Sequence, residues 1–89
     1  MTAKRTDANQ AEIVEGLRAM GATVQTLHEV GKGCPDILIG FRGHNYLIEI
    51  KVEGAGLNER EHRWHQQWRG QVTIARTLEQ AVEIITRDE

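Results

Sequence analysis

The chain is short of several residue types, and each shortage excludes a class of protein. Of its 89 residues only Cys34 is a cysteine, which excludes an intrachain disulfide and any zinc site built from several cysteines. Aromatic residues make up 4% of the chain, so a sugar-stacking cleft is excluded and stacking platforms for single-stranded RNA are not expected. The formal net charge of -2 gives no general attraction to nucleic acid, so such binding must come from local basic patches.

Long apolar runs are also missing. No run approaches the ~18 residues that a membrane-spanning helix needs, and no basic-then-apolar leader opens the chain. We therefore expect no membrane association, no secretion signal and a cytoplasmic location. Residues 1–6 have the composition of a flexible basic tail, and residues 7–89 that of a single domain. A chain this short buries only about 60% of its unfolded surface, and a dimer interface would add to that.

Periodic apolar residues divide the domain into helices and strands. Asp7, with a glutamine three residues later, has the spacing of a helix-capping box, and Thr77 repeats this spacing before the last helix. Stretches rich in β-branched residues predict strands between the helices. The predicted elements are a helix over 7–20, a strand over 22–27, strands over 36–41 and 45–52, a helix over 58–69, a strand over 71–75 and a last helix after Thr77.

This α-β-β-β-α-β-α order predicts an α/β architecture. Short connections allow the first three strands to pair antiparallel, whereas the fourth arrives through a helical crossover and should join parallel to a neighbour. The result is a mixed four-stranded sheet with helices on both faces. Covered faces explain why the stretches "ILIGF" and "YLIEI" are almost continuously apolar.

Three charged residues interrupt these two apolar strands. If the turn between them centres on residues 42 and 43, Asp36 lies opposite Glu49, with Cβ atoms ~4.5 to 5.5 Å apart. Lys51 follows Glu49 by two positions and so projects from the same face. A turn centred one residue later would place Asp36 opposite Lys51 and would still keep the three side chains within reach of one another.

Two carboxylates this close repel each other unless a proton or a cation lies between them. A divalent ion such as Mg²⁺ suits carboxylate oxygens, keeps several waters and also binds phosphate. The simpler alternative is structural, with Asp36 capping the strand and Glu49 paired with Lys51. A buried ion pair is costly, however, and a third charge makes this alternative costlier.

The same residues resemble a known signature. Pro35-Asp36, twelve residues and then Glu49-Ile50-Lys51 resemble the PD-(D/E)XK nuclease superfamily, whose core has the same order of helices and strands. Over nearly the whole chain the sequence is similar to the short stand-alone VRR-NUC proteins of phages and bacteria. The stretches that carry this wider resemblance are "DANQAEIVEGLRAMGA", "LHEVGKGCPDILIG", "LIEIK", "LNEREHRWHQQWRGQV" and "LEQA".

The resemblance implies a restriction endonuclease-like fold and Mg²⁺- or Mn²⁺-dependent cleavage of DNA phosphodiesters. Asp36 and Glu49 match the metal-binding acids of the family, and the carbonyl of Ile50 matches a backbone metal ligand. Lys51 matches the lysine that orients the attacking water. Physically, the metal lowers the pKa of a bound water, and the lysine stabilises negative charge in the transition state.

The chain departs from the superfamily at one position. Many members carry an acid on the first helix, and that place falls on Gln10 rather than on Glu12. A glutamine is a weaker metal ligand, so the number of metal ions is left open. Glu61 matches a position that carries Gln or Glu near the active centre of many VRR-NUC proteins. It is either an auxiliary catalytic residue or a partly exposed glutamate at the helix start, favoured by the dipole of its helix.

The second long helix combines an inward stripe with a basic face. Leu57, Glu61, Trp64 and Trp68 share one helix face, which predicts that this face turns toward the core. Arg60 and Arg63 follow a different face. Together with Lys32 in the glycine-containing loop "HEVGKG", these arginines are candidates for contacts with DNA phosphates, although charged helix faces are more often simply solvated.

From these residues we expect an endonuclease that needs Mg²⁺ or Mn²⁺ and no organic cofactor. The resemblance extends to relatives that act as dimers on branched DNA such as Holliday junctions, so the expected partners are DNA and a second copy of the chain. A dyad-related pair of sites can cut opposing strands, which one small domain cannot do. The expected location is the cytoplasm of a bacterium or phage-infected cell. The alternative from another class is a DNA-binding module that has a nuclease fold but no activity.

Overall fold

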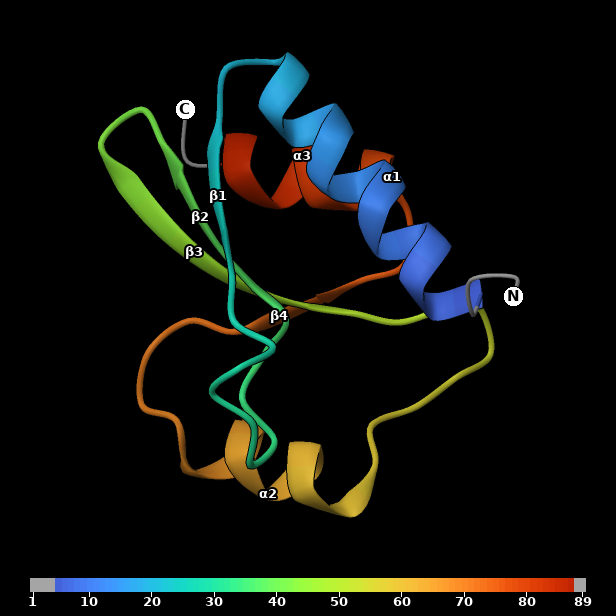
Figure 1. Ribbon diagram of the computed structural model, residues 1–89. Coiled ribbons are helices and arrows are strands. Elements are labelled where there is room, and N and C mark those ends of the chain that lie inside the picture. Colours follow the sequence, from blue (N-terminus) through green and yellow to red (C-terminus); the bar gives the residue numbers. More distant parts are fainter. Residues whose placement is uncertain (1–4, 88–89) are drawn as a thin grey trace.

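The computed structural model describes residues 5–87, and the side chains from residue 8 onward. It contains the seven predicted elements in the predicted α-β-β-β-α-β-α order. Figure 1 shows two helices packed side by side against the sheet and a third helix standing apart from them. The elements are α1 (Arg5–Ala19), β1 (Thr23–Thr26), β2 (Ile37–Phe41), β3 (His44–Ile50), α2 (Glu59–Gln67), β4 (Thr73–Ala75) and α3 (Leu78–Thr86).

The strands form one mixed sheet in the order β1-β2-β3-β4. β1 pairs antiparallel with β2, and β2 pairs antiparallel with β3. β4 joins β3 in parallel because α2 and its two connections carry the chain back to the same end of the sheet. The predicted mixed four-stranded architecture is therefore confirmed.

The β2–β3 hairpin has the first of the two predicted registers. Ile37 pairs with Ile48 and Phe41 with His44, so the residue before β2 lies opposite Glu49. The turn is made by Arg42 and Gly43, both in the left-handed region with φ values of 51° and 83°. Two consecutive positive φ values are typical of the tight hairpin turn whose twist matches that of the strands. A register slip of one residue would move every side chain of β3 to the other face.

One face of the sheet and the two packed helices enclose the core. Alternate residues of β2 and β3 point toward α1 and α3, and these apolar side chains are almost completely buried. The helices contribute apolar stripes at helical spacing, as the sequence predicts. The buried apolar residues are Ile13, Val14, Leu17, Ala22, Ile37, Ile39, Tyr46, Ile48, Ile50, Ala75, Ala81, Ile84 and Ile85.

The helix α2 covers only one end of the opposite face. Its side chains reach Glu49 and Lys51, which project away from the core, and none of its own residues is buried. The inward stripe predicted for this helix is therefore only partly correct, since Trp68 is 45% exposed. Trp68 instead stacks on Trp64, with ring centroids 4.7 Å apart. Extended segments lead into and out of α2 and hold it beyond the strand ends (Figure 1).

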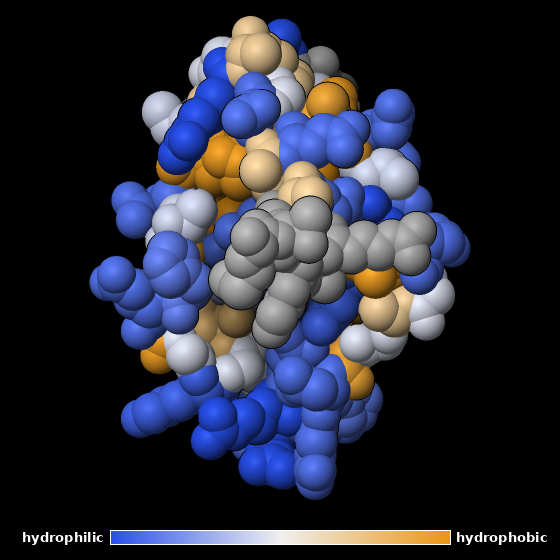
Figure 2. All heavy atoms as spheres, turned by 45° about the vertical axis from the view of Figure 1, so that its right-hand side comes forward, coloured by the Kyte–Doolittle hydropathy of each residue, from blue (hydrophilic) through white to orange (hydrophobic). Residues whose placement is uncertain are grey.

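The helix ends differ slightly from the predicted ones. α1 begins at Arg5, so Asp7 lies inside the helix instead of capping it, and residues 1–4 of the predicted tail lie outside the described part. The cap at Thr77 is confirmed, because its hydroxyl accepts a hydrogen bond from the N–H of Gln80. Figure 2 shows a largely hydrophilic surface on one face of the molecule. Among the described residues, no helix is long and apolar enough to cross a membrane.

Candidate active site

The hairpin brings Asp36 and Glu49 together at one end of the sheet. Asp36 directly precedes β2, and its Oδ2 accepts a hydrogen bond of 2.7 Å from the N–H of Ile50. The carboxylate thus takes the place of a ladder carbonyl at the point where β2 begins. Glu49 lies opposite and is only 1% exposed. The strand-capping role considered for Asp36 is therefore real, but it engages one carboxylate oxygen and leaves the other beside Glu49.

Lys51 offsets the charge of the acid pair only in part. Burial, a side-chain hydrogen bond with Asp36 and the Asp36 charge together raise the pKa of Glu49 from 4.5 to about 9, against a smaller opposing effect of Lys51. Burial also raises the pKa of the Cys34 thiol, and the charges of Glu49 and Asp36 add to this. The acid pair therefore keeps a proton in the absence of metal, and a bound cation would let Glu49 ionise.

Lys51 lies on the same face as Glu49 and is held by α2. Its Nζ lies 2.6 Å from Oε1 of Glu61, and both side chains are 16% exposed. The same Glu61 oxygen accepts the N–H of Asn58, while the Asn58 side chain accepts the N–H of Glu61. Burial works to raise the pKa of Glu61, but the hydrogen bonds from Lys51 and Asn58 outweigh it and lower that pKa. Glu61 therefore caps its helix and also contacts Lys51, while its auxiliary catalytic role stays a prediction.

His65 is a site residue that the sequence interpretation missed. It follows Glu61 by four residues, so it lies one turn further along the same side of α2. Its Nε2 lies 3.6 Å from Oε1 of Glu49, and their side chains are 13% and 2% exposed. Neither of these two buried atoms has a hydrogen-bond partner. Burial lowers the pKa of His65, against an opposing effect of the Glu61 charge.

The donor set fits a hard divalent ion that keeps much of its water. Within residues 5–87, no group of three or more His, Cys, Asp and Glu side chains is arranged to hold a metal ion. Mg²⁺ does not need such a group, because it binds through one or two carboxylates and completes its coordination with waters and substrate phosphate. The Asp36–Glu49 pair supplies those carboxylates. Oε1 of Glu49 has no hydrogen-bond partner and can coordinate a metal ion.

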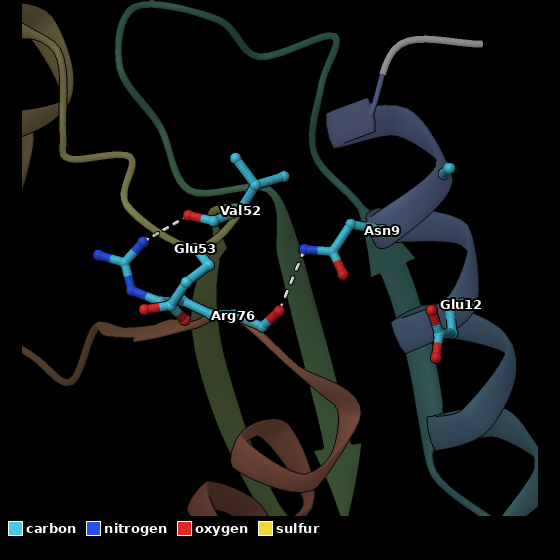
Figure 3. Close-up of a pocket in the computed structure, with 6 residues that line it drawn as sticks. Asn9, Glu12, Val52, Glu53 and Arg76 are labelled. Carbon is cyan, nitrogen blue, oxygen red and sulfur yellow. Dashed lines mark hydrogen bonds between the residues drawn. The ribbon is translucent and has the colours of Figure 1, made fainter. Parts of the chain in front are cut away.

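Two residues outside the predicted site, Asn9 and Arg76, donate hydrogen bonds to backbone carbonyls of the segment 51–55. Asn9 of α1 donates from Nδ2 to the carbonyls of Lys51, at 3.3 Å, and Arg76, at 3.2 Å. Arg76 in turn donates to the carbonyls of Val52 and Ala55, each at 2.6 Å. Figure 3 shows Asn9 and Arg76 converging on the segment that follows β3. They line a hollow of about 300 Å³ together with Ala8, Glu12, Val52 and Glu53.

Gln10 lines a different hollow. This hollow has a volume of about 460 Å³ and lies between α1 and the end of β1, where Thr26 and His28 form the opposite wall. Thr26 pairs with Ile37, and the N–H of Leu27 donates to the carbonyl of Asp36. Gln10 therefore lies on the side of the site where Asp36 enters β2.

The three basic residues predicted to contact DNA are all exposed. Lys32 lies in a loop that touches α2, because a Cβ on Gly33 would come within 2.5 Å of the carbonyl oxygen of Arg60. Only glycine permits this close approach. Arg63 is engaged with Glu59, with 3.3 Å between Nη2 and Oε1. Lys32 and Arg60 thus lie on two segments that contact each other, whereas Arg63 forms an ion pair with Glu59.

Comparison with known proteins gives one informative match. No family model and no curated protein matches the sequence. A solved structure described as "VRR_NUC domain" superposes with a TM-score of 0.75 and 26% identity, covering 93% of this chain and 96% of that one. A match over 93% of the chain agrees with the mixed sheet and its helices.

Proposed function

We propose that this chain, whose resemblance to the VRR-NUC nucleases is confirmed by the structural match, is a DNA endonuclease that depends on Mg²⁺ or Mn²⁺. The chain has a nuclease fold of the restriction endonuclease-like type. Cleavage, metal dependence and substrate choice are the parts that we propose. The observation that supports them best is the convergence of Asp36, Glu49 and Lys51 at one end of the sheet.

The acids and the lysine suit phosphodiester hydrolysis. Asp36, Glu49 and the carbonyl of Ile50 would hold the metal ion, which would supply an activated water and neutralise phosphate oxygens. Lys51 places a cation beside the acids, where it stabilises the negative charge that the phosphate gains in the transition state. Glu61 holds the Lys51 ammonium at 2.6 Å and so restricts where that charge can lie. Gln10 would contribute a neutral side chain next to Asp36.

The substrate that we propose is branched DNA, bound by a homodimer. Lys32 and Arg60 lie on segments that contact each other and would contact backbone phosphates, with Arg63 joining when DNA displaces Glu59. One chain with a Cα radius of gyration of 12.6 Å is too small to hold two arms of a junction. A dimer with twofold symmetry would present two sites to opposing strands.

A panel of substrates tests the activity. Four-way junction, linear duplex and single-stranded DNA are incubated with the purified protein in Mg²⁺, in Mn²⁺ and in chelator. Lys51→Ala removes the ammonium, and Asp36→Asn removes a charge but keeps an oxygen that can accept the N–H of Ile50. We expect metal-dependent cutting by the wild type, with junctions preferred, and no cutting by either variant. Cutting in chelator, or cutting retained by both variants, contradicts the mechanism.

The same panel decides between an enzyme and a binding module. Gln10 stands where many relatives have an acid, which favours the module. Binding to DNA without cutting on any substrate would establish that alternative. With single-stranded RNA added to the panel, cutting of RNA in preference to DNA would change the substrate class. For the dimer, light scattering should give twice the chain mass of 10.1 kDa. A fully active species of 10.1 kDa would contradict the paired-site arrangement.

A further inference from the structure

His65 and Glu49 present two buried polar atoms to each other that nothing else engages. Nε2 of His65 and Oε1 of Glu49 lie 3.6 Å apart. A hydrogen bond between nitrogen and oxygen is about 2.7 to 3.2 Å long, so the pair is just outside that range. A buried polar atom without a partner costs about 1 to 3 kcal/mol, which makes this a place where a structural role alone would be unfavourable.

We propose that His65 is a positioning residue whose Nε2–H donates to Oε1 of Glu49 and orients that carboxylate toward the metal ion. The inference rests on the proposed function, because it concerns the same metal site. Carboxylates that bind metal ions are themselves held by hydrogen bonds, and loss of such a partner typically lowers metal affinity 10- to 100-fold. Closing the gap by roughly 0.5 Å would form the bond.

The anchoring of α2 supports this assignment. The helix has no buried residue, so it is held by a few polar contacts. Two of these contacts come from residues one turn apart, Glu61 to Lys51 and His65 to Glu49. The helix α2 thereby contacts both the Lys51 ammonium and the Glu49 carboxylate and restricts their positions. His65 does this through Glu49 and not as a ligand, because Mg²⁺ and Mn²⁺ take oxygen ligands, whereas an imidazole nitrogen suits softer transition metals.

Three substitutions separate a donor from a space-filling side chain. The Nε2 of glutamine is as many bonds from Cα as the Nε2 of histidine, so His65→Gln can place an N–H at the same point. His65→Asn places its N–H one bond short, and His65→Leu offers none. His62 lies on the same helix but is exposed, so His62→Leu is the matched control.

The experiment measures Mg²⁺ and Mn²⁺ affinity by calorimetry on the full chain, with no substrate present. We expect His65→Leu and His65→Asn to weaken both affinities 10- to 100-fold, and His65→Gln and His62→Leu to stay within about threefold of the wild type. Far-UV circular dichroism checks that each variant is folded. Should His65→Leu fail to fold, the contrast between His65→Gln and His65→Asn still decides the question. Equal affinities in all variants overturn the proposal, as does equal weakening in His65→Gln and His65→Leu.

A spectroscopic measurement separates positioning from ligation. Electron spin echo modulation of bound Mn²⁺ detects a directly coordinated nitrogen. We expect no such coupling from His65, whereas a coupling that disappears in His65→Leu would show a direct ligand and overturn the assignment. The proposed function fails separately. It fails if Glu49→Gln leaves metal affinity unchanged, whereas an effect of Glu49→Gln without any effect of His65→Leu refutes the positioning role alone.

Discussion

Replacing Glu49 with glutamine should stabilise the metal-free protein at neutral and alkaline pH. Burial and the neighbouring Asp36 raise the pKa of Glu49 to about 9 from its ordinary 4.5. Between these two values the folded chain binds a proton that the unfolded chain has lost. The free energy of unfolding therefore falls as the pH rises through this window, and the stabilisation present below pH 4.5 is lost by about pH 9.

The size of the effect follows from the shift. Neutral pH lies roughly 2.5 units above the ordinary pKa, and each unit corresponds to about 1.36 kcal/mol, so the loss at pH 7 is on the order of 3 kcal/mol. That is a large part of the ~5 to 15 kcal/mol that stabilises a typical domain. Glutamine has the same shape and does not titrate, so Glu49→Gln should remove this slope.

The assay is urea unfolding followed by far-UV circular dichroism, in chelator, at pH 5, 7 and 9. We expect the wild type to lose stability across this series and Glu49→Gln to lose much less, with Glu15→Gln, an exposed residue of α1, behaving like the wild type. Adding Mg²⁺ at pH 7 should recover stability in the wild type only. If the free energy of unfolding has the same pH dependence in the wild type and in Glu49→Gln, the pKa of Glu49 is not raised, and the reasoning is refuted.

Three further predictions concern the surroundings of the site. Gly31→Ala, with open space around it, should cost only about 1 to 2 kcal/mol in urea unfolding from its positive φ. Gly33→Ala carries the same strain and also brings its Cβ against the carbonyl of Arg60, so it should cost at least about 1 kcal/mol more than Gly31→Ala and slow cleavage; equal effects would contradict the close approach. Asn9→Ala should cost about 1 to 3 kcal/mol in thermal or urea unfolding, because it leaves two carbonyls without their donor, and an unchanged stability would show these bonds to be unimportant. Glu61→Gln keeps an acceptor for the helix cap but removes the charge facing Lys51. Single-turnover cleavage should therefore slow about 10-fold or more, while the free energy of unfolding falls by less than about 2 kcal/mol. A normal cleavage rate would exclude a role of Glu61 in catalysis.

The sequence carries enough information to predict the hairpin and its acid pair. Apolar alternation and the turn residues limit β2 and β3 to two registers, and the structure has the one that places Asp36 opposite Glu49. These are local constraints, because a slip of one residue would expose the whole apolar set. The predicted position of Lys51 beside Glu49 follows from the same alternation. The structure agrees with both expectations, while the chemical roles of these residues remain proposals.

The surroundings of α2 were harder to predict. The apolar stripe indicated that Trp64 and Trp68 face the core, yet Trp68 is 45% exposed and His65 is the residue that reaches Glu49. Extended connections on both sides of the helix decide its distance from the sheet, and helical periodicity contains no information about that distance. The one available signal was the spacing of four residues between Glu61 and His65, which places both on one side of the helix. Asn9 acts through backbone carbonyls distant in sequence, so no local pattern identifies it.

The central claim is that the acid pair and Lys51 form a metal-dependent nuclease site. Single-turnover cleavage of an end-labelled four-way junction, measured over a Mg²⁺ titration, tests it most directly. The wild type should cut at a rate that rises with Mg²⁺ and saturates, and Lys51→Ala should cut at least about 100-fold more slowly, while Arg87→Ala, at the exposed residue that follows α3, should match the wild type. Cleavage that is independent of Mg²⁺, or equal rates for the wild type and Lys51→Ala, would contradict the claim.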